Sequence, residues 1–289
     1  MSSPDQSILS LVRLQTALGP RVPGSPAHDA LGAVISGRLD ASADEVHEQR
    51  FGVRLRGRSV ECVNLIGVLR AGGAHAAHAA DRGALLLGTH YDTRPIADRD
   101  PDPEKRGSPI PGANDGGSGT AILLHLLGRL RGMRPDRDVL IVFFDAEDLG
   151  DIENHPFSIG AELFASHAVP GQPGVGEAVI LDMVGGEGMV LDIDAHVLHH
   201  EPSRALTQTV FSIGEEMGAQ PFLADKPRKL KYIICDQWAF LKRGIPSCLL
   251  IDIDYPPWHT HGDVPEAMSE SSLRIIEEVV WSFLRLPRV

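Results

Sequence analysis

Histidines and carboxylates recur in this chain at the ends of short apolar runs or in the turns beside them. The stretches are LLLGTHYD (85–92), PIPGANDGGSGTA (109–121), VLIVFFDAED (139–148), AVILDMVG (178–185) and WHTHGD (258–263). Their polar residues include His90, Asp92, Asp115, Glu147, Asp148, Asp182 and His259. Burying so many acids without a partner would be very costly, and a divalent cation removes that cost. Imidazole and carboxylate donors without cysteine suit zinc in a catalytic site with an open position.

Most of these residues have a simpler interpretation when they are taken singly. His90 could be a buried structural histidine, and Asp115 could be a helix N-cap, because aspartate is favoured at that position. Asp182 could likewise be a cap or a turn residue. His259 lies in a loop with prolines and a glycine, where a solvent-exposed histidine is the simpler interpretation, and His261 competes with it as a ligand.

The pair Glu147-Asp148 is harder to explain as part of a solvated surface, because it follows the apolar run VLIVFF so closely. Adjacent residues at a strand end point in different directions. One acid can therefore bind a metal ion while its neighbour faces a substrate. Taken together, the polar residues at the strand ends predict a metal-dependent hydrolase or transferase.

An α/β framework must position these residues. Almost continuously apolar runs at 84–87, 139–144, 178–181 and 248–251 suit central strands that are covered on both faces. Helical stretches lie between them, at 121–130, 159–166, 203–217 and 236–242. Strands that alternate with helices indicate an α/β sandwich, in which ligands bind beyond the carboxyl ends of the strands. We expect one domain over residues 1–289, because no stretch has the composition of a linker.

The flanking parts of the chain carry helix-start and hairpin signals. Ser3-Pro4 and Ser25-Pro26 are typical of an N-cap followed by proline in the first helical turn. Ser271 can cap a last helix. The alternation over 51–55 and the run 60–69, joined by a turn, predict an antiparallel strand pair.

Charge and cysteine content exclude some classes of protein. The chain has 289 residues and a formal net charge of −12, which argues against nucleic acid or an anionic membrane as a partner. Cys62, Cys235 and Cys248 are scattered and odd in number, so they indicate neither a disulfide framework nor a cysteine zinc motif, although one bridge stays open.

Two sequence features bear on location. The first 20 residues lack a basic segment followed by an apolar run, so they do not form a signal peptide. No stretch approaches the roughly 20 apolar residues of a membrane span. We therefore expect a cytoplasmic protein, unless the chain is the processed form of an exported one.

The ordered motifs GTHYDTRP, GANDGGSG, FFDAED, LDMVG and WHTHGD resemble those of metallopeptidase family 28. That resemblance implies a three-layer αβα sandwich around a mixed, mostly parallel sheet. Within the family the closer resemblance is to bacterial glutaminyl-peptide cyclotransferases, because GPRVPGSPAH (19–28) and the tryptophan of WHT are similar to their motifs. The likeness extends from Leu9 to Leu286.

The cyclase pattern implies one zinc ion with Asp115, Asp148 and His259 as ligands. Glu147 then falls on the general acid/base position, and Asp182 on an acid that supports proton transfer. Two further positions concern the substrate: Trp258 falls on the aromatic wall of its pocket, and Asp236 on the acid at the start of a following helix.

The aminopeptidase pattern of the same family implies two zinc ions. His90, Asp115 and Asp182 would hold the first, and Asp115 would bridge to a second ion on the cyclase ligands. All the positions are filled, so ligand identity does not choose between the two activities. There are three departures. The usual Glu-Glu pair is Glu147-Asp148 here, and the family's Asp-His pair before Pro-Phe is replaced by DQWAF (236–240). An apolar residue within Ser247–Ile251 replaces the histidine of the cyclases.

Three functions follow as expectations. As a cyclase, the protein would convert the N-terminal glutamine of peptides to pyroglutamate with release of ammonia, and Glu147 would carry the proton. As a di-zinc aminopeptidase, it would use Glu147 to deprotonate the attacking water and remove N-terminal residues. A non-catalytic binding domain ranks last, because the ligands and Glu147 are intact.

Overall fold

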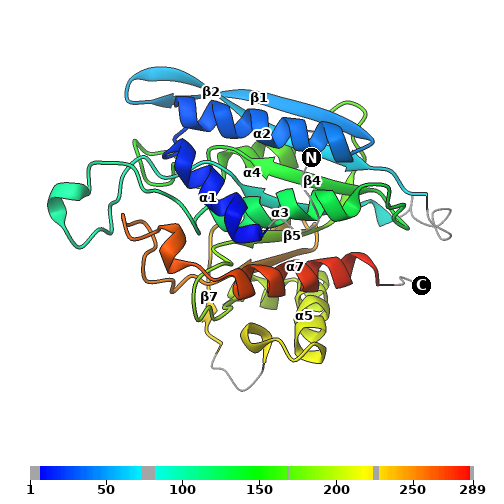
Figure 1. The fold of residues 1–289 in the computed structure, drawn as a ribbon. Coiled ribbons are helices and arrows are strands. Elements are labelled where there is room, and N and C mark those ends of the chain that lie inside the picture. The colour runs from blue at the N-terminus through cyan, green and yellow to red at the C-terminus, as the bar shows by residue number, and fades with distance from the viewer. Residues whose placement is uncertain (1–6, 73–81, 168, 224–227, 287–289) are drawn as a thin grey trace.

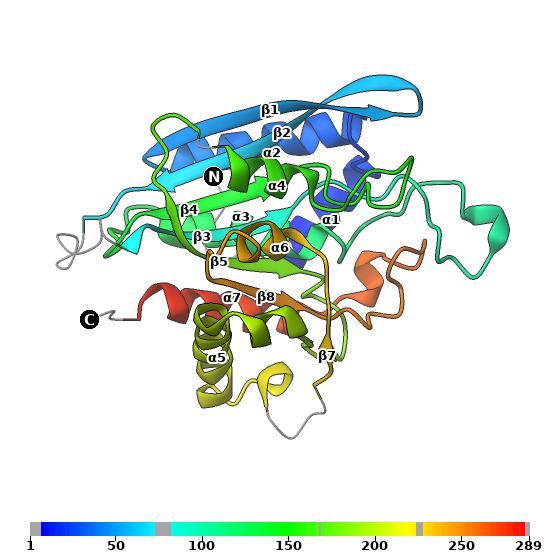
Figure 2. The same cartoon turned by 180° about the vertical axis from the view of Figure 1, so that it is seen from behind.

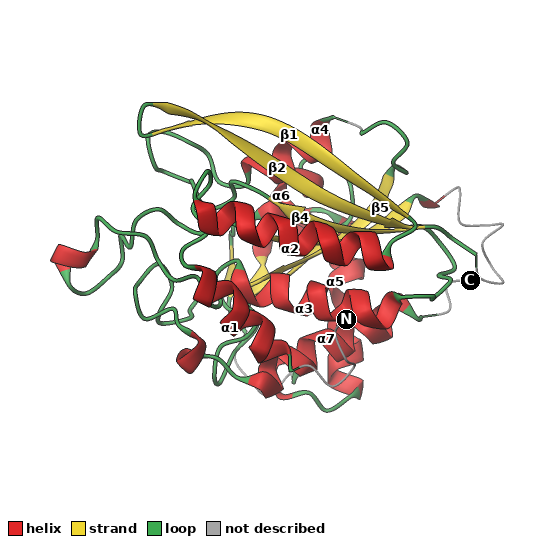
Figure 3. Ribbon diagram, turned by 45° about the horizontal axis from the view of Figure 1, so that its top comes forward, coloured by secondary structure: helices red, strands yellow, loops and turns green. Residues whose placement is uncertain are grey.

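The centre of the molecule is a mixed sheet, drawn in yellow in Figure 3. The computed structural model describes residues 7–72, 82–167, 169–223 and 228–286, and six of their strands form this sheet. In spatial order they are β1 (Glu45–Leu55), β2 (Arg58–Leu69), β4 (Val139–Phe144), β3 (Ala84–His90), β5 (Val175–Asp182) and β8 (Ser247–Ile251). β1, β2 and β4 pair antiparallel, whereas β4, β3, β5 and β8 pair in parallel.

Helices cover both faces of the sheet and complete three layers. One face carries α1 (Ile8–Leu18), α2 (Pro26–Ser42), α3 (Gly117–Leu130) and α7 (Glu270–Leu284), as Figure 1 shows. The other face carries α4 (Ile159–Ser166) and α6 (Asp236–Leu241), seen from behind in Figure 2. α5 (Glu201–Glu216) packs against β8 and α7. The predicted αβα sandwich is confirmed.

Short elements make up the remaining regular structure of the described residues. β6 (Ile193–Asp194) and β7 (Leu230–Lys231) form a separate two-stranded parallel sheet. Single turns of 3₁₀-helix lie at Pro103–Lys105, Ala195–His199, Gln220–Phe222 and Pro265–Ala267. No described helix is both long enough and apolar enough to cross a membrane.

The apolar runs become central strands because both of their faces are covered. Successive side chains of a strand point to opposite faces. In β3, Leu85 and Leu87 pack into the core beneath α1, α3 and α7, whereas Ala84 and Leu86 pack into the core beneath α4 and α6. Every residue of β3, β4 and β8 is buried. The sheet is therefore a rigid support for whatever its strand ends carry.

The start of the last helix corrects one prediction. Ser269, not Ser271, caps α7, and its side chain accepts a hydrogen bond from the Ser272 N–H. The helix begins early because the carboxylate of Glu270, its first residue, accepts hydrogen bonds from the start of α1, including that of the Leu9 N–H at 2.7 Å. This contact between the two chain ends holds Glu270 in place.

Other boundaries differ by a few residues. α1 has Ser7 as its N-cap, and the predicted cap at Ser3-Pro4 lies outside the described residues. The helix predicted from Ala121 begins at Gly117. Cys62, Cys235 and Cys248 are buried free thiols, so no disulfide joins them. The single domain over 1–289 stays a prediction.

Candidate metal centre and catalytic site

The carboxyl ends of β3, β4 and β5 meet at one edge of the sheet (Figure 2). His90 is the last residue of β3, and Asp182 is the last residue of β5. Glu147 and Asp148 follow β4, and Asp115 lies just before α3. Parallel neighbours that end at the same edge thus bring residues from distant parts of the chain together.

Asp115 lies in a glycine turn and does not cap the helix that follows. The N-cap of α3 is Gly116, with a left-handed φ of 69°, and no side-chain cap hydrogen bond forms. A Cβ atom at Gly116 would lie 2.5 Å from the carbonyl oxygen of Asp92, so a glycine is required. The turn directs the Asp115 carboxylate toward the histidines, 3.3 Å from His90 Nε2 and 3.6 Å from His259 Nε2.

Two groups of buried side chains could each hold a metal ion, and they share Asp115. His90, Asp115 and Asp182 form the first group, and Asp115, Asp148 and His259 form the second. Within each group the ligand atoms all lie within 4.8 Å of one another. His90 Nε2 is 3.3 Å from Asp182 Oδ1, and His259 Nε2 is 3.3 Å from Asp148 Oδ1. The structure therefore brings together all the predicted ligand residues.

His261 lies outside both groups. Its Nδ1 atom is 2.9 Å from Asp100 Oδ2, and its Nε2 atom is 3.0 Å from Ser108 Oγ. Both of its ring nitrogens thus have partners of their own. Of the two competing histidines, the structure turns only His259 toward Asp115.

The second group contains buried oxygens that no protein group satisfies. Asp115 Oδ2 and Asp148 Oδ2 are buried and have no hydrogen-bond partner, which is costly for a carboxylate. Burial, together with the charge of Asp115, raises the pKa of Asp148 to about 6. A bound cation would reverse that shift, because it favours the charged carboxylate. Two carboxylates and an imidazole without thiolate fit zinc.

In the first group, the two residues other than Asp115 are satisfied from within the protein. His90 Nδ1 is 3.3 Å from Asp92 Oδ1, and His90 Nε2 is 3.3 Å from Asp182 Oδ1. Asp182 Oδ2 accepts a hydrogen bond from the Cys235 thiol at 3.3 Å. Both nitrogens of His90 and both oxygens of Asp182 therefore have partners. The sequence carried no signal for Cys235, because its contact with Asp182 joins residues 53 positions apart.

Two further aspartates hold the backbone of the ligand loops. Asp92 accepts hydrogen bonds from the N–H groups of Glu147 (3.1 Å) and Asp148 (3.2 Å). Asp263 does the same for the N–H of Asp115, at 3.1 Å. The sequence singled out Asp92 without a role, and it showed Asp263 only as the end of WHTHGD. Neither role could be read locally, because the partners lie 55 and 148 residues away.

The far nitrogen of His259 also faces a carboxylate. Its Nδ1 atom lies 3.3 Å from Asp98 Oδ1. Arg94 donates two hydrogen bonds to Asp98, at 2.8 and 2.9 Å, and a third to the carbonyl oxygen of Asp148, at 3.2 Å. The contact between His259 and Asp98 is an ion-pair contact, because His259 Nδ1 has no hydrogen-bond partner. A carboxylate at the far nitrogen of a metal-binding histidine typically helps to orient the ring. Sequence reasoning missed both Asp98 and Arg94.

Glu147 is the acid beside the metal-binding groups. It is 5% exposed, and its Oε1 atom accepts a hydrogen bond from the Ser158 hydroxyl at 3.1 Å. Burial raises the pKa of Glu147 well above the usual value; His90 opposes that shift, and the charge of Asp236 adds to it. A carboxyl whose pKa is raised in this way is suited to take up a proton and release it again.

Asp236, the first residue of α6, lies within electrostatic reach of Glu147 and is fully buried. Neither of its carboxylate oxygens has a hydrogen-bond partner. Ser158 is near enough to lower the pKa of Asp236, but its single hydroxyl proton goes to Glu147. Burial outweighs that effect and raises the pKa of Asp236 to about 7. Beside the metal-binding groups the site thus contains two further buried acids, Glu147 and Asp236, and Asp236 has two unused acceptors.

Residues beside the site adopt a backbone conformation that non-glycine residues rarely take. Ala146 has a φ of 56°, Met183 of 48° and His259 of 57°. Ala146 precedes Glu147, and Met183 follows Asp182. Each such conformation costs about 1–3 kcal/mol and persists only where the surrounding structure enforces it. Here the enforced backbone directs Glu147, Asp182 and His259.

Trp258 is half-buried beside the second group. Its ring centroid is 4.6 Å from that of His259, and Arg99 Cζ lies 3.7 Å from the indole centroid. Its predicted role in a substrate wall stays a prediction. In β8, all five residues are buried, and the position of the missing histidine belongs to the apolar core.

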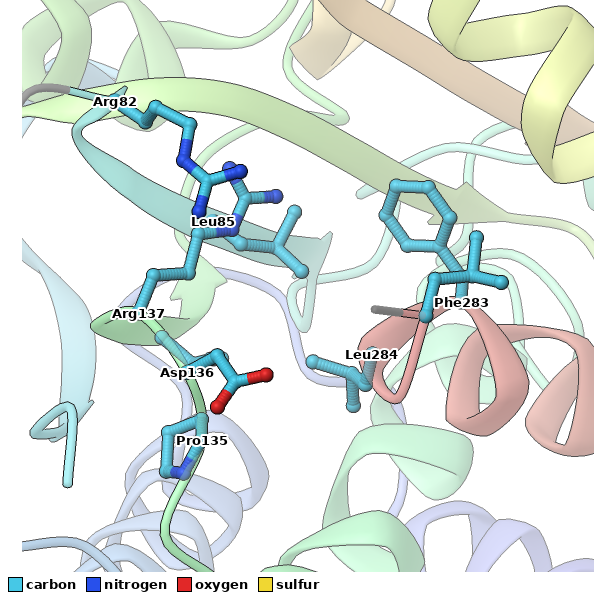
Figure 4. Close-up of a pocket in the computed structure, with 9 residues that line it drawn as sticks. Arg82, Leu85, Pro135, Asp136, Arg137, Phe283 and Leu284 are labelled. Carbon is cyan, nitrogen blue, oxygen red and sulfur yellow. The ribbon is translucent and has the colours of Figure 1, made fainter. Parts of the chain in front are cut away.

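A separate hollow lies at the opposite edge of the sheet, near the amino ends of β3 and β4 (Figure 4). Arg82 and Arg137 extend toward one another on one side of it, and Phe283 and Leu284 of α7 lie on the other. Its volume is about 20 Å³, which suits about one water molecule. A neighbouring cavity of about 370 Å³ shares Arg82, Arg137 and Phe283 with it. The histidine–carboxylate cluster is the candidate site because its buried donor atoms could hold a metal ion.

Comparison with known proteins identifies a family. The family model described as peptidase family M28 matches residues 64–284, a range that contains the metal-binding groups, Glu147 and Asp236. No curated protein matches the chain.

Several solved structures are similar over almost the whole chain. A glutaminyl cyclase from Tannerella forsythia has 25% identity and a TM-score of 0.85, over 99% of each chain. A Zn-dependent exopeptidase from Parabacteroides distasonis has 28% identity and a TM-score of 0.85, over 99% of this chain and 98% of that one. A leucine aminopeptidase precursor from Bacteroides thetaiotaomicron has 26% identity and a TM-score of 0.86, with the same coverage.

Proposed function

The chain belongs to peptidase family M28, and we propose that it is a zinc-dependent glutaminyl-peptide cyclotransferase. The observation that carries this proposal is the difference between its two metal-binding groups. Asp148 Oδ2 of the second group is buried without a hydrogen-bond partner, whereas His90 and Asp182 of the first group satisfy one another and have further partners in the protein. Asp115 Oδ2 also lacks a hydrogen-bond partner, but Asp115 belongs to both groups. The second group therefore gains most from a cation. This supports one zinc ion, held by Asp115, Asp148 and His259.

The proposed reaction closes the N-terminal glutamine of a peptide on itself. A zinc ion in the second group would polarise the side-chain amide carbonyl as a Lewis acid. Glu147 takes a proton from the α-amino group, whose nitrogen attacks the amide carbon and forms the new C–N bond. Glu147 then gives that proton to the side-chain amide nitrogen. The bond from carbon to this nitrogen breaks, and pyroglutamyl peptide and ammonia leave.

Neighbouring side chains support the proton transfer and the position of the substrate. Ser158 donates to Glu147 Oε1, which leaves Oε2 for the proton. The two unpartnered oxygens of Asp236 suit the N–H groups of a glutamine side chain or α-amine. Asp182 extends the acidic network on the other side of His90. Trp258, beside His259, would pack along the glutamine side chain.

A di-zinc aminopeptidase is the second candidate, because the first metal-binding group is complete. His90, Asp115 and Asp182 present ligand atoms within 4.8 Å of one another, enough for a second ion with Asp115 as the bridge. Glu147 would then deprotonate the attacking water, and the substrate would be the first peptide bond. Two of the similar structures are described as an exopeptidase and an aminopeptidase precursor.

One pair of measurements separates these activities. The purified protein is given a peptide with N-terminal glutamine and, separately, an aminoacyl amide, while ammonia and product mass are followed and bound zinc is counted. Pyroglutamyl peptide, ammonia from the first substrate only and one zinc ion per chain would support the cyclase. Hydrolysis of the aminoacyl amide with two zinc ions would support the aminopeptidase. Absence of both zinc and turnover would favour a non-catalytic binding domain.

A further inference from the structure

The segment GPRVPGSPAH (19–28), which follows α1 and includes the first residues of α2, contains a fully buried arginine. Arg21 has no exposed surface, although arginine is among the residues most rarely buried in proteins. Its guanidinium lies against the turn that carries Asp115. Nη1 donates to the carbonyl oxygen of Pro111, and Nη2 donates to that of Gly112 at 2.5 Å. Arg21, in the N-terminal segment, therefore binds the turn that carries Asp115.

The backbone of Arg21 adds a second connection. Its carbonyl oxygen accepts a hydrogen bond from the Thr93 N–H at 3.2 Å. Thr93 comes directly after Asp92, whose carboxylate accepts hydrogen bonds from the N–H groups of Glu147 and Asp148. One residue thus contacts both the loop after β3 and the turn before α3, which are also joined directly by the hydrogen bond from the Ile110 N–H to the Arg94 carbonyl oxygen at 3.2 Å.

Two glycines of the turn leave the space that the Arg21 guanidinium and its carbonyl partners need. Gly112 has a φ of 65°, and a Cβ atom there would lie 2.3 Å from Thr93 Cγ2 and 3.0 Å from Arg21 Nη2. A Cβ atom at Gly117 would lie 2.5 Å from the carbonyl oxygen of Gly112. A larger residue at either position would displace the carbonyls that Arg21 binds. The glycine-rich turn and the buried arginine therefore form one fitted unit.

The surroundings of Arg21 do not favour it as a stabilising residue alone. Its Nε atom is buried without a hydrogen-bond partner, which is costly. Burial lowers the pKa of Arg21 to about 10, and the charges of Asp263 and Asp115 act against that shift, so the side chain stays charged at neutral pH. The Arg21 guanidinium is thus a buried cation with an unsatisfied donor, and it lies beside an acidic site. Because this arrangement is costly for stability, we look for its role in that site.

We propose that Arg21 is a positioning residue for the metal centre: it holds the Pro111–Gly112 carbonyls so that Asp115 is in ligand geometry before a metal ion binds. The inference rests on the proposed zinc site but not on the choice between cyclase and aminopeptidase, since Asp115 is a ligand in both. Outer partners of metal ligands typically contribute ten- to a hundred-fold in affinity, and Arg21 acts on Asp115 through its turn in this way.

The sign of the effect separates positioning from a simple charge effect. If Arg21 were only a nearby positive charge, its removal would relieve repulsion and tighten zinc binding. If it positions Asp115, its removal misplaces a ligand and weakens zinc binding. Arg21→Lys keeps the charge but presents one ammonium group in place of the two-armed guanidinium. We therefore expect Arg21→Lys to weaken zinc binding less than Arg21→Met does.

The experiment measures zinc affinity by chelator competition in the wild-type protein, Arg21→Met and Arg21→Lys. We expect Arg21→Met to bind zinc about ten- to a hundred-fold more weakly than the wild type, with Arg21→Lys in between. Arg137→Met is the matched control. Arg137 is also buried and pairs with Glu177, but it lies at the opposite edge of the sheet (Figure 4), so its loss should leave zinc affinity unchanged.

The melting temperature of each zinc-free variant shows whether it is folded. Unchanged or tighter zinc binding by folded Arg21→Met would overturn the inference and leave the proposed function standing. If Arg21→Met does not fold, Arg21→Lys decides, and wild-type affinity in that variant would overturn the inference. If the wild-type protein itself binds no zinc, the metal centre and this role of Arg21 both fall.

Discussion

Replacing Glu147 with glutamine tests the proposed proton transfer with little change of shape. The amide keeps an acceptor for the Ser158 hydroxyl, which donates to Glu147 Oε1 at 3.1 Å, but it cannot take a proton from the substrate. General acid–base catalysis contributes about 10²–10⁴ in rate, so we expect turnover to fall by that factor. The loss corresponds to about 3–5 kcal/mol in the activation barrier. Zinc should stay bound, because Glu147 lies in neither metal-binding group.

Although Glu147→Gln should lower turnover, it should raise the free energy of unfolding of the zinc-free protein at neutral pH. Burial raises the pKa of Glu147 in the folded protein, so above pH 4.5, the ordinary value for this group, the folded state binds more protons than the unfolded state. The free energy of unfolding of the zinc-free wild type therefore decreases as pH rises from 4.5 to the folded pKa. Glutamine does not titrate. Zinc-free Glu147→Gln should thus match the wild type below pH 4.5 and exceed it at neutral pH.

The assay follows ammonia release from a glutaminyl peptide, with bound zinc and melting temperature measured on the same samples. Glu277→Gln is the control, because Glu277 is also a buried glutamate but pairs with His125 and Arg129 between α3 and α7. It should lower stability and leave turnover near that of the wild type. Near-normal turnover of zinc-loaded Glu147→Gln would refute the proton-transfer role. Loss of zinc together with activity would instead place Glu147 among the metal ligands.

Three further predictions concern the metal centre and its support. Asp115→Ala should abolish zinc binding, because Asp115 belongs to both metal-binding groups; a chelator titration that finds wild-type affinity would contradict this. His259→Ala should lose zinc while His261→Ala keeps it, and metal analysis giving the reverse would exchange the assignment. His28 Nε2 lies 2.9 Å from Asp145 Oδ1. Burial lowers the pKa of His28, but Asp145 together with Asp92 and Asp29 raises it, and the net shift is upward from 6.5. The charged His28 therefore stabilises the fold fully below pH 6.5, and this contribution is lost as pH rises through the raised pKa. The stability difference between wild type and His28→Gln in urea should therefore shrink above pH 6.5, and a constant difference would rule the pair out.

The fold could be predicted largely because its central strands are buried on both faces. Val139–Phe144 has no polar residue to suggest a surface, so an interior strand is the simplest structure for it. Helix starts were harder to predict. The cap at Ser269 depends on Glu270 contacting α1 across the molecule, a contact that spans more than 260 residues. Serine at 271 is an equally good local cap signal, and only the packing of the two chain ends selects the earlier one.

The chemistry of the candidate site could be predicted from the sequence because only a few residue types bind metal ions. His90 and Asp182 end their strands as predicted, and the glycines around Asp115 indicate a tight turn. Residue type alone could not identify the groups that hold those ligands in place. Asp98 and Cys235 have no local feature that separates them from other aspartates and cysteines of the chain. Their importance lies entirely in their contacts with His259 and Asp182.

Local spacing was enough to indicate an α/β sandwich whose strand ends carry zinc-type ligands around Asp115, because burial pattern and donor chemistry are properties of short stretches. The tertiary structure decided which groups act on one another. It turned His259 rather than His261 to Asp115, placed Asp236 by Glu147, and left Asp115 Oδ2 without a partner. It also brought Arg21 beneath the turn, 91 residues away along the chain. Such contacts depend on strand register and on loops that pack against each other, which no window of the sequence contains.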